Sequence, residues 1–251
     1  MKLNPLTLKK VRTHARELFP RESCGIIVED DYLPMNNLHP FPEKAFRMDE
    51  SVFLQYPKLQ SIIHSHPNGP EWPTKTDMAC QRETAVPWGI LPLDDTRFGE
   101  FFWVGNDEIP PLLKRPFRHG VTDCYALMRD WYILHRGIIC EDVPRDWEWW
   151  NKGDNFYEDH FASLGFVTID KRDVKEGDVF FACLRSKIVN HAGIYAGRGL
   201  IFHHVSSRLG YDPSCLSGEA PLGIWQRFIK KWIRYDPSIP TRKTVQVRPR
   251  S

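Results

Sequence analysis

Three prolines within ten residues divide the chain into two parts. The segment 109–118 reads IPPLLKRPFR. Each proline fixes its own φ and restricts the residue before it, so none of them suits the interior of a helix. With 251 residues, the chain is long enough for two domains of about 100 to 150 residues, each with its own core. We therefore expect a first domain over residues 1–108, a linker over 109–118 and a second domain over 119–235.

Charge and hydropathy exclude several classes of protein. The net charge is +2 with acidic and basic residues interspersed, which indicates no nucleic acid partner. No apolar run approaches the roughly 18 residues that span a bilayer, and the N-terminus lacks the apolar stretch of a signal peptide, so we expect no direct membrane span. The six cysteines are widely spread without a CxxC pair, which favours reduced thiols and folding in a cytoplasm. The basic tail 236–251 is expected to be flexible.

Hydrophobic periodicity predicts alternating strands and helices in the first domain. Residues 7–19 form an amphipathic pattern that Pro20 stops, which indicates a helix. Thr74 and Asp77 match a capping box, with an acidic residue three positions after a hydroxyl, so a second helix should begin there and run to Ala85. Short apolar runs between turn residues predict strands at 25–28, 52–54, 61–63, 88–91 and 98–104.

The most specific pattern in the first domain is IIHSHP at residues 62–67. The period of two in a strand sends His64 and His66 to the same face, where two imidazoles can bind one metal ion. Asp77, in the first turn of the following helix, can supply a carboxylate as the third ligand. A set of two histidines and one aspartate leaves the fourth zinc position open for water, which catalysis needs.

A zinc-bound water also requires a base that is not itself a ligand. Glu22, just before the first strand, is the candidate, and the hydroxyl of Thr74 could donate to the oxyanion of a tetrahedral intermediate. This set of five residues resembles the pattern of the JAMM (JAB/MPN) metallopeptidases, with threonine at position 74 where the family usually has serine. Over residues 1–108 the resemblance implies a β-α-β sandwich and zinc-dependent hydrolysis of peptide or isopeptide bonds.

The second domain is predicted to begin with a helix that carries a cysteine at its start. Thr122 or Asp123 can act as the N-cap and Gly137 as the residue that ends the helix. A helix N-terminus lowers the pKa of a thiol, so Cys124 is the predicted nucleophile. Strand-like runs follow at 178–183, 191–196 and 200–205, so that a helix precedes a small antiparallel sheet. The chain as a whole is therefore expected to be α+β.

A predicted hairpin brings the histidines of the second domain together. The three-residue loop at 197–199 places His191 opposite Val205. Residues of equal parity share a face, so His203 lies beside His191 while His204 points away. His191 is the predicted base and His203 its orienting residue. A register shift of one residue would give the second role to His204.

These features resemble the NlpC-type cysteine peptidases, which have a papain-like core. The resemblance covers about residues 112–235 and is carried by Asp123–Cys124, the segment 191–197 and His203. It implies hydrolysis of peptidoglycan stem peptides, commonly between D-γ-glutamate and diaminopimelate. Residues 125–126 are Tyr-Ala where cellular members usually have Ser-Gly, which puts the exact substrate in question.

The order of the two domains, with residues 115–120 leading into 123–125, resembles the tail-tip proteins of lambda-like tailed phages. That resemblance implies a hydrolase made in the host cytoplasm, with other phage tail-tip proteins and peptidoglycan peptides as partners. It also implies a place at the virion tail tip and action in the host periplasm. The alternative is a structural tail-tip component or chaperone in which one or both sites are inactive.

Overall fold

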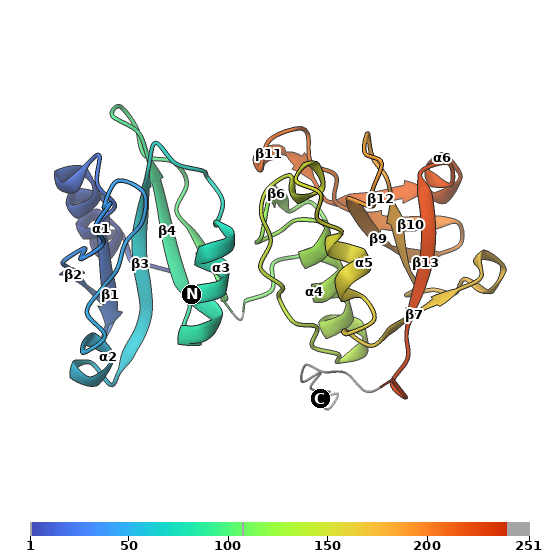
Figure 1. Ribbon diagram of the computed structural model, residues 1–251, viewed down its shortest axis with the longest axis horizontal. Coiled ribbons are helices and arrows are strands. Elements are labelled where there is room, and N and C mark those ends of the chain that lie inside the picture. The colour runs from blue at the N-terminus through green and yellow to red at the C-terminus, as the bar shows by residue number, and fades with distance from the viewer. Residues whose placement is uncertain (1, 107, 240–251) are drawn as a thin grey trace. The chain divides into compact units, whose positions relative to one another are not determined.

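The computed structural model describes residues 2–106 and 108–239 (Figure 1). The chain splits into two compact units, Met1–Ile109 and Pro110–Ser251, and the division falls at the start of the proline-rich segment. Residues 240–251, most of the predicted flexible tail, lie outside the described residues. All six cysteines are free thiols.

The first unit contains a five-stranded sheet in the order β2-β1-β3-β4-β5. The pairs β1–β2, β1–β3 and β4–β5 are antiparallel, whereas β3 and β4 are parallel and α3 connects them. The elements of this unit are α1 (Pro5–Leu18), β1 (Cys24–Val28), β2 (Asp31–Met35), α2 (Val52–Gln55), β3 (Leu59–Pro67), α3 (Lys75–Thr84), β4 (Trp88–Leu93) and β5 (Phe102–Val104).

The core under α1 determines which residues of β3 point to the opposite face. Ile63 is fully buried in a cluster with Ala15 of α1 and Leu91 of β4. Because successive side chains of a strand alternate between faces, His64 and His66 project away from this core. A slip of one residue would expose Ile63, so packing against α1 specifies the position of both histidines.

The predicted strand at 52–54 is wrong, because this segment forms the short helix α2. Local hydrogen bonds favour the helical turn: the Ser51 N–H donates to the Asp49 carboxylate at 2.8 Å, and the Gln55 amide donates to the Ser51 hydroxyl at 2.9 Å. Only Val52 is buried, whereas Leu54 is 85% exposed. The run of apolar residues was too short to distinguish a strand from a single helical turn.

The second unit contains a six-stranded antiparallel sheet in the order β12-β10-β9-β8-β13-β7, and β6 pairs separately with β11. Tyr132 of α4 packs in one core with Val179 of β8 and Ile194 of β9, so the helix covers one face of the sheet. The elements are β6 (Pro116–Arg118), α4 (Cys124–Arg136), η1 (Trp149–Asn151), α5 (Phe156–His160), β7 (Phe166–Ile169), η2 (Lys171–Asp173), β8 (Val179–Ala182), β9 (His191–Gly197), β10 (Leu200–His203), β11 (Tyr211–Leu216), β12 (Gly218–Pro221), α6 (Leu222–Trp225) and β13 (Ile229–Tyr235). The predicted α+β class is confirmed.

Buried charges fix the start of α4. Asp123 is the N-cap, and its carboxylate accepts the N–H of Ala126 at 2.9 Å and that of Gly120 at 2.8 Å. The Arg145 guanidinium donates to both carboxylate oxygens, at 2.9 and 2.7 Å. Burial alone would raise the pKa of Asp123, but the charge of Arg145 and the two backbone donors hold it well below its ordinary value. Asp123 is therefore ionised and rigid next to Cys124.

Within the described ranges, no helix is long and apolar enough to cross a bilayer.

Two candidate active sites

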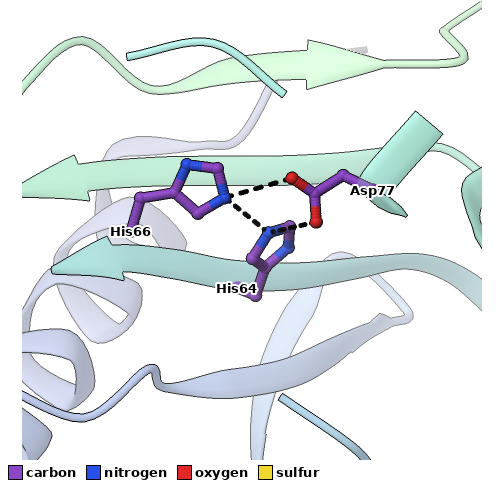
Figure 2. A group of neighbouring side chains, drawn as sticks. All are labelled: His64, His66 and Asp77. Atoms are coloured by element: carbon purple, nitrogen blue, oxygen red, sulfur yellow. Dashed lines mark hydrogen bonds and ion pairs between the residues drawn. The ribbon is translucent and has the colours of Figure 1, made fainter. Parts of the chain in front are cut away.

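The first candidate site joins the end of β3 to the first turn of α3. The Nε2 atoms of His64 and His66 are 3.0 Å apart, and each lies 3.3 Å from an oxygen of Asp77 (Figure 2). All three ligand atoms lie within 4.8 Å of one another. The structure thus brings together the three residues that the sequence predicts as metal ligands.

The hydrogen bonds of the imidazoles fit a metal ion. His66 Nδ1 lies 2.9 Å from the carbonyl oxygen of Pro70, which can only accept, so Nδ1 carries the proton and Nε2 presents its lone pair. Burial lowers the pKa of His64, which keeps that ring neutral, whereas the carboxylate of Asp77 raises the pKa of His66 against the opposing effect of burial. Burial alone would raise the pKa of Asp77, but its interactions with the two imidazoles hold it well below its ordinary value. Two imidazole nitrogens and one carboxylate are a donor set typical of catalytic zinc.

Glu22 lies in the turn before β1 and is only 8% exposed. Burial raises its pKa to about 7, with an opposing effect from His66 and a further increase from Asp77. The carbonyl of Ser23, the next residue, accepts the N–H of Ser65 at 3.0 Å between the two histidines, so the backbone places Glu22 close to the candidate metal site. A carboxyl group with a pKa near neutrality can both accept and donate a proton, as a general base must.

Thr74 forms the predicted capping box with Asp77. Its hydroxyl donates to Asp77 Oδ2 at 2.7 Å and accepts the Asp77 N–H at 3.1 Å, while the Thr74 N–H donates to the same Oδ2 at 2.7 Å. In this arrangement the hydroxyl orients the carboxylate of Asp77, the candidate metal ligand. Its predicted role as an oxyanion donor stays a prediction.

The second candidate site lies where α4 meets the sheet. Cys124 is the first residue of α4 and His191 the first of β9, and both line a cavity of about 660 Å³. The backbone N–H of Ala192, the next residue of β9, approaches the Cys124 thiol. The structure therefore brings the predicted nucleophile to the strand that begins with the predicted base.

The register of the β9–β10 hairpin agrees with the parity argument. His203 pairs with Gly193, two residues beyond His191, and the two imidazole rings are 5.8 Å apart at 88°. His204 is fully buried, and its Nε2 lies 3.0 Å from the carbonyl oxygen of Cys215. His203 is therefore the neighbour of His191, although the cavity is lined by His191 and His204 and not by His203.

The predicted low pKa of Cys124 is wrong for this arrangement. Burial raises the pKa of the thiol to about 11, and the charge of Asp123 adds to this increase. Burial, together with His203 and His204, holds the pKa of His191 well below its ordinary value. Desolvation disfavours both charged forms more than the helix N-terminus favours the thiolate. At neutral pH the resting site therefore contains a neutral thiol and a neutral imidazole.

Two aromatic residues belong to this site although no sequence pattern identified them. The hydroxyl oxygen of Tyr157 lies 3.1 Å from Cys124 Sγ. Trp225 packs against both imidazoles, with ring centroids 4.4 Å from His203 and 5.4 Å from His191. Tyr157 lies in α5, within a segment rich in aromatic residues between α4 and β7.

Comparison with known proteins identifies both units. The model of the prokaryotic homologues of the JAB domain matches residues 6–104, and that of the NlpC/P60 family matches residues 114–219. Tail tip assembly protein K of Escherichia phage N15 is 30% identical over 239 residues, covering 91% of this chain and 94% of that protein. The chain belongs to the tail tip assembly protein K family.

Other relatives match smaller parts of this family member. Tail tip assembly protein K of Escherichia phage lambda is 36% identical over 152 residues, covering 61% of this chain and 72% of the phage lambda protein. A probable TtuB-protein conjugate cleaving protease of Thermus thermophilus is 30% identical over 102 residues, which are 36% of this chain and 68% of that protease. Both units therefore belong to domain families whose members are typically hydrolases.

Proposed function

We propose that this tail tip assembly protein is a hydrolase with two active sites. The second unit hydrolyses peptidoglycan stem peptides at a bond of the D-γ-glutamyl-diaminopimelate type, and the first hydrolyses a peptide or isopeptide bond with zinc. The observation that carries the proposal is that Cys124 and His191 line one cavity large enough for a peptide, with the His203 ring next to that of His191.

In the second unit the Cys124 thiol and the His191 imidazole are both neutral before the reaction, so the thiol must lose its proton as it attacks the substrate. His191 accepts the thiol proton as Cys124 Sγ attacks the scissile carbonyl, and it then protonates the leaving amine. Water next hydrolyses the acyl-enzyme, with His191 again acting as the base. His203 keeps the His191 ring in place, because the two rings contact each other and both pack against Trp225.

In the first unit, His64, His66 and Asp77 would hold the metal. A zinc ion held by these residues would act as a Lewis acid and would lower the pKa of a bound water. Glu22, buried in the turn before β1, accepts the proton that the attacking water loses and passes it to the leaving amine. The relative named as a conjugate-cleaving protease supports an isopeptide bond as the substrate of this unit.

Membership of the tail tip assembly protein K family supports a place in the phage life cycle. We infer synthesis in the host cytoplasm, binding to other tail-tip proteins, and action on the cell wall from the virion tail tip in the periplasm.

Mass spectrometry of muropeptides incubated with the full-length protein tests the cysteine site. The wild type and His64→Ala should cut the stem peptide, and Cys124→Ala should not. Turnover that survives Cys124→Ala would assign the cut to another group. If the wild type cuts no muropeptide, and phage carrying Cys124→Ala still form infectious particles, the chain has a structural role instead.

Metal analysis tests the first unit. The purified protein should bind about one zinc ion per chain at neutral pH, and the double variant His64→Ala/His66→Ala should bind none. A wild-type protein without affinity for zinc would contradict the proposed metallopeptidase.

A further inference from the structure

The cavity beside Cys124 combines aromatic walls with cationic groups. Half-buried Trp147, Trp150 and Trp225 line it. Two exposed arginines, Arg185 and Arg208, also line it. Neither guanidinium forms an ion pair with any residue that the structure describes. Apolar walls reduce the screening of a charge by water, so an arginine at the rim of such a cavity attracts an anion more strongly than one on an open surface.

Most of the other ionisable groups of the cavity are neutral or paired. Asp123 is bound to Arg145 at 2.7 Å, and burial lowers the pKa of His119 to about 4, so that this ring is uncharged at neutral pH. Burial likewise keeps the other lining histidines neutral. The remaining acidic group is Glu148, and its single negative charge is exceeded by the two positive charges of Arg185 and Arg208. The cavity therefore has a net positive charge.

Side-chain hydrogen bonds shape the two loops that carry the arginines. The Asn190 side chain accepts the N–H of Leu184 at 2.8 Å and donates to its carbonyl at 3.0 Å, which closes the loop containing Arg185 immediately before His191. The Ser206 hydroxyl donates to the carbonyl of Leu209 at 3.0 Å across Arg208. Both arginines thus extend from closed loops at the cavity rim.

We propose that Arg185 and Arg208 form a carboxylate-binding subsite next to Cys124. A guanidinium binds a carboxylate through two parallel N–H···O bonds, which a neutral amide cannot match. The site should therefore select stem peptides whose carboxylates are free and reject those in which they are amidated. This specificity rests on the proposed cysteine peptidase function. It adds that the substrate of that peptidase must present a free carboxylate.

Binding to an inactive protein tests the subsite without requiring cleavage. Full-length Cys124→Ala is titrated with the tripeptide L-alanyl-γ-D-glutamyl-diaminopimelate, and with the same tripeptide whose free carboxylates are all converted to amides. The acid form should bind about tenfold more tightly, consistent with a charge-assisted hydrogen-bond pair. Adding Arg185→Gln and Arg208→Gln should reduce this ratio to less than about twofold.

Two further variants serve as controls in the Cys124→Ala background. Arg198 is an exposed arginine in the β9–β10 turn that does not line the cavity, and Arg198→Gln should leave the tenfold ratio unchanged. Glu148→Gln removes the opposing charge and should strengthen binding of the acid form. Thermal unfolding of each variant shows whether it is folded, and the ratio of the two affinities does not depend on the fraction of active protein.

The outcomes separate this subsite from the proposed function. If wild type cleaves both tripeptides equally well and Cys124→Ala binds them equally, the subsite is wrong while the peptidase stands. If wild type cleaves neither, yet Cys124→Ala prefers the acid form through the two arginines, the subsite stands and the peptidase function fails. Failure of Cys124→Ala to bind either tripeptide overturns the subsite.

Discussion

The phenyl ring of Phe46 stacks on the imidazole of His64, with centroids 4.6 Å apart and planes inclined at 27°. Trp88 packs edge-on against the same imidazole at 5.6 Å. The loop that carries Phe46 is held by Asn37, whose amide donates to the carbonyls of Glu22 and Ala45, both at 3.0 Å. One asparagine therefore ties the aromatic support of a metal ligand to the proposed general base.

Phe46→Ala should weaken zinc binding by about tenfold, because groups that support a metal ligand typically contribute at this level. Competition with a chromogenic chelator measures the affinity. Phe41→Ala is the control, because Phe41 is 63% exposed in the same loop and should not change the affinity. Equal zinc affinities for Phe46→Ala and the wild type would show that the stacking does not hold His64.

Glu22→Gln should abolish proton transfer while the protein keeps about one zinc ion per chain, since Glu22 is assigned as a base and not as a ligand. Asp77→Asn should instead lose most of its zinc affinity, because an amide oxygen is a much weaker ligand than a carboxylate. Metal analysis after dialysis distinguishes the two. Loss of zinc from Glu22→Gln would make Glu22 a ligand and remove it as the base.

The raised pKa of Cys124 predicts slow alkylation at neutral pH. The rate of iodoacetamide labelling at Cys124 should keep rising up to pH values near 11, because only the thiolate reacts. Tyr157→Phe removes a hydroxyl that lowers this pKa, so it should slow labelling at pH 8 by a few fold. Peptide mapping by mass spectrometry resolves Cys124 from the other thiols. A rate that levels off below pH 8 would restore the expected low pKa.

Arg145→Ala should reduce the free energy of unfolding of the second unit by about 3–5 kcal/mol, because it leaves the Asp123 carboxylate buried without its partner. Arg172→Ala provides the comparison. Arg172 pairs with Asp170 on the surface, where water and salt screen the ion pair, so its loss should change the stability far less. Urea unfolding followed by tryptophan fluorescence measures both. Similar losses in the two variants would contradict the structural role of the buried pair.

Acid should destabilise the second unit through Asp123. The folded-state pKa of this carboxyl lies below its unfolded value of about 3.9, so its stabilising contribution is complete above that pH and is lost as the pH falls towards the folded pKa. Asp123→Asn should therefore flatten the decrease in unfolding free energy between about pH 4 and pH 2. If the variant keeps the full wild-type slope, other carboxyl groups cause the acid sensitivity.

Features that depend on local spacing could be predicted from the sequence. His64 and His66 lie on the same face because side chains in a strand alternate with a period of two. The capping box could be predicted because Asp77 follows Thr74 by three residues. The parity of His191 and His203 follows from the length of one hairpin loop, and the observed register agrees with it. In each case the interacting groups are close in sequence or joined by one turn.

Features that depend on distant contacts could not be predicted. Tyr157 reaches Cys124 from 33 residues away, and Arg145 reaches Asp123 from 22 residues away, with no pattern linking either pair. The degree of burial that raises the Cys124 pKa is likewise set by the whole cavity wall. The strand predicted at 52–54 is wrong for a different reason, because three apolar residues fit a strand and a helical turn equally well.

The carboxylate of Asp77 closes the start of α3 and also faces both histidine ligands. If this site binds zinc, formation of the first turn of α3 and metal binding should be thermodynamically coupled, because both use the same carboxylate. A substitution that frays the first turn of α3 would release metal, and removal of metal would loosen that turn. Substitutions at positions 74 and 77 should therefore affect both the stability of this helix and the affinity for metal.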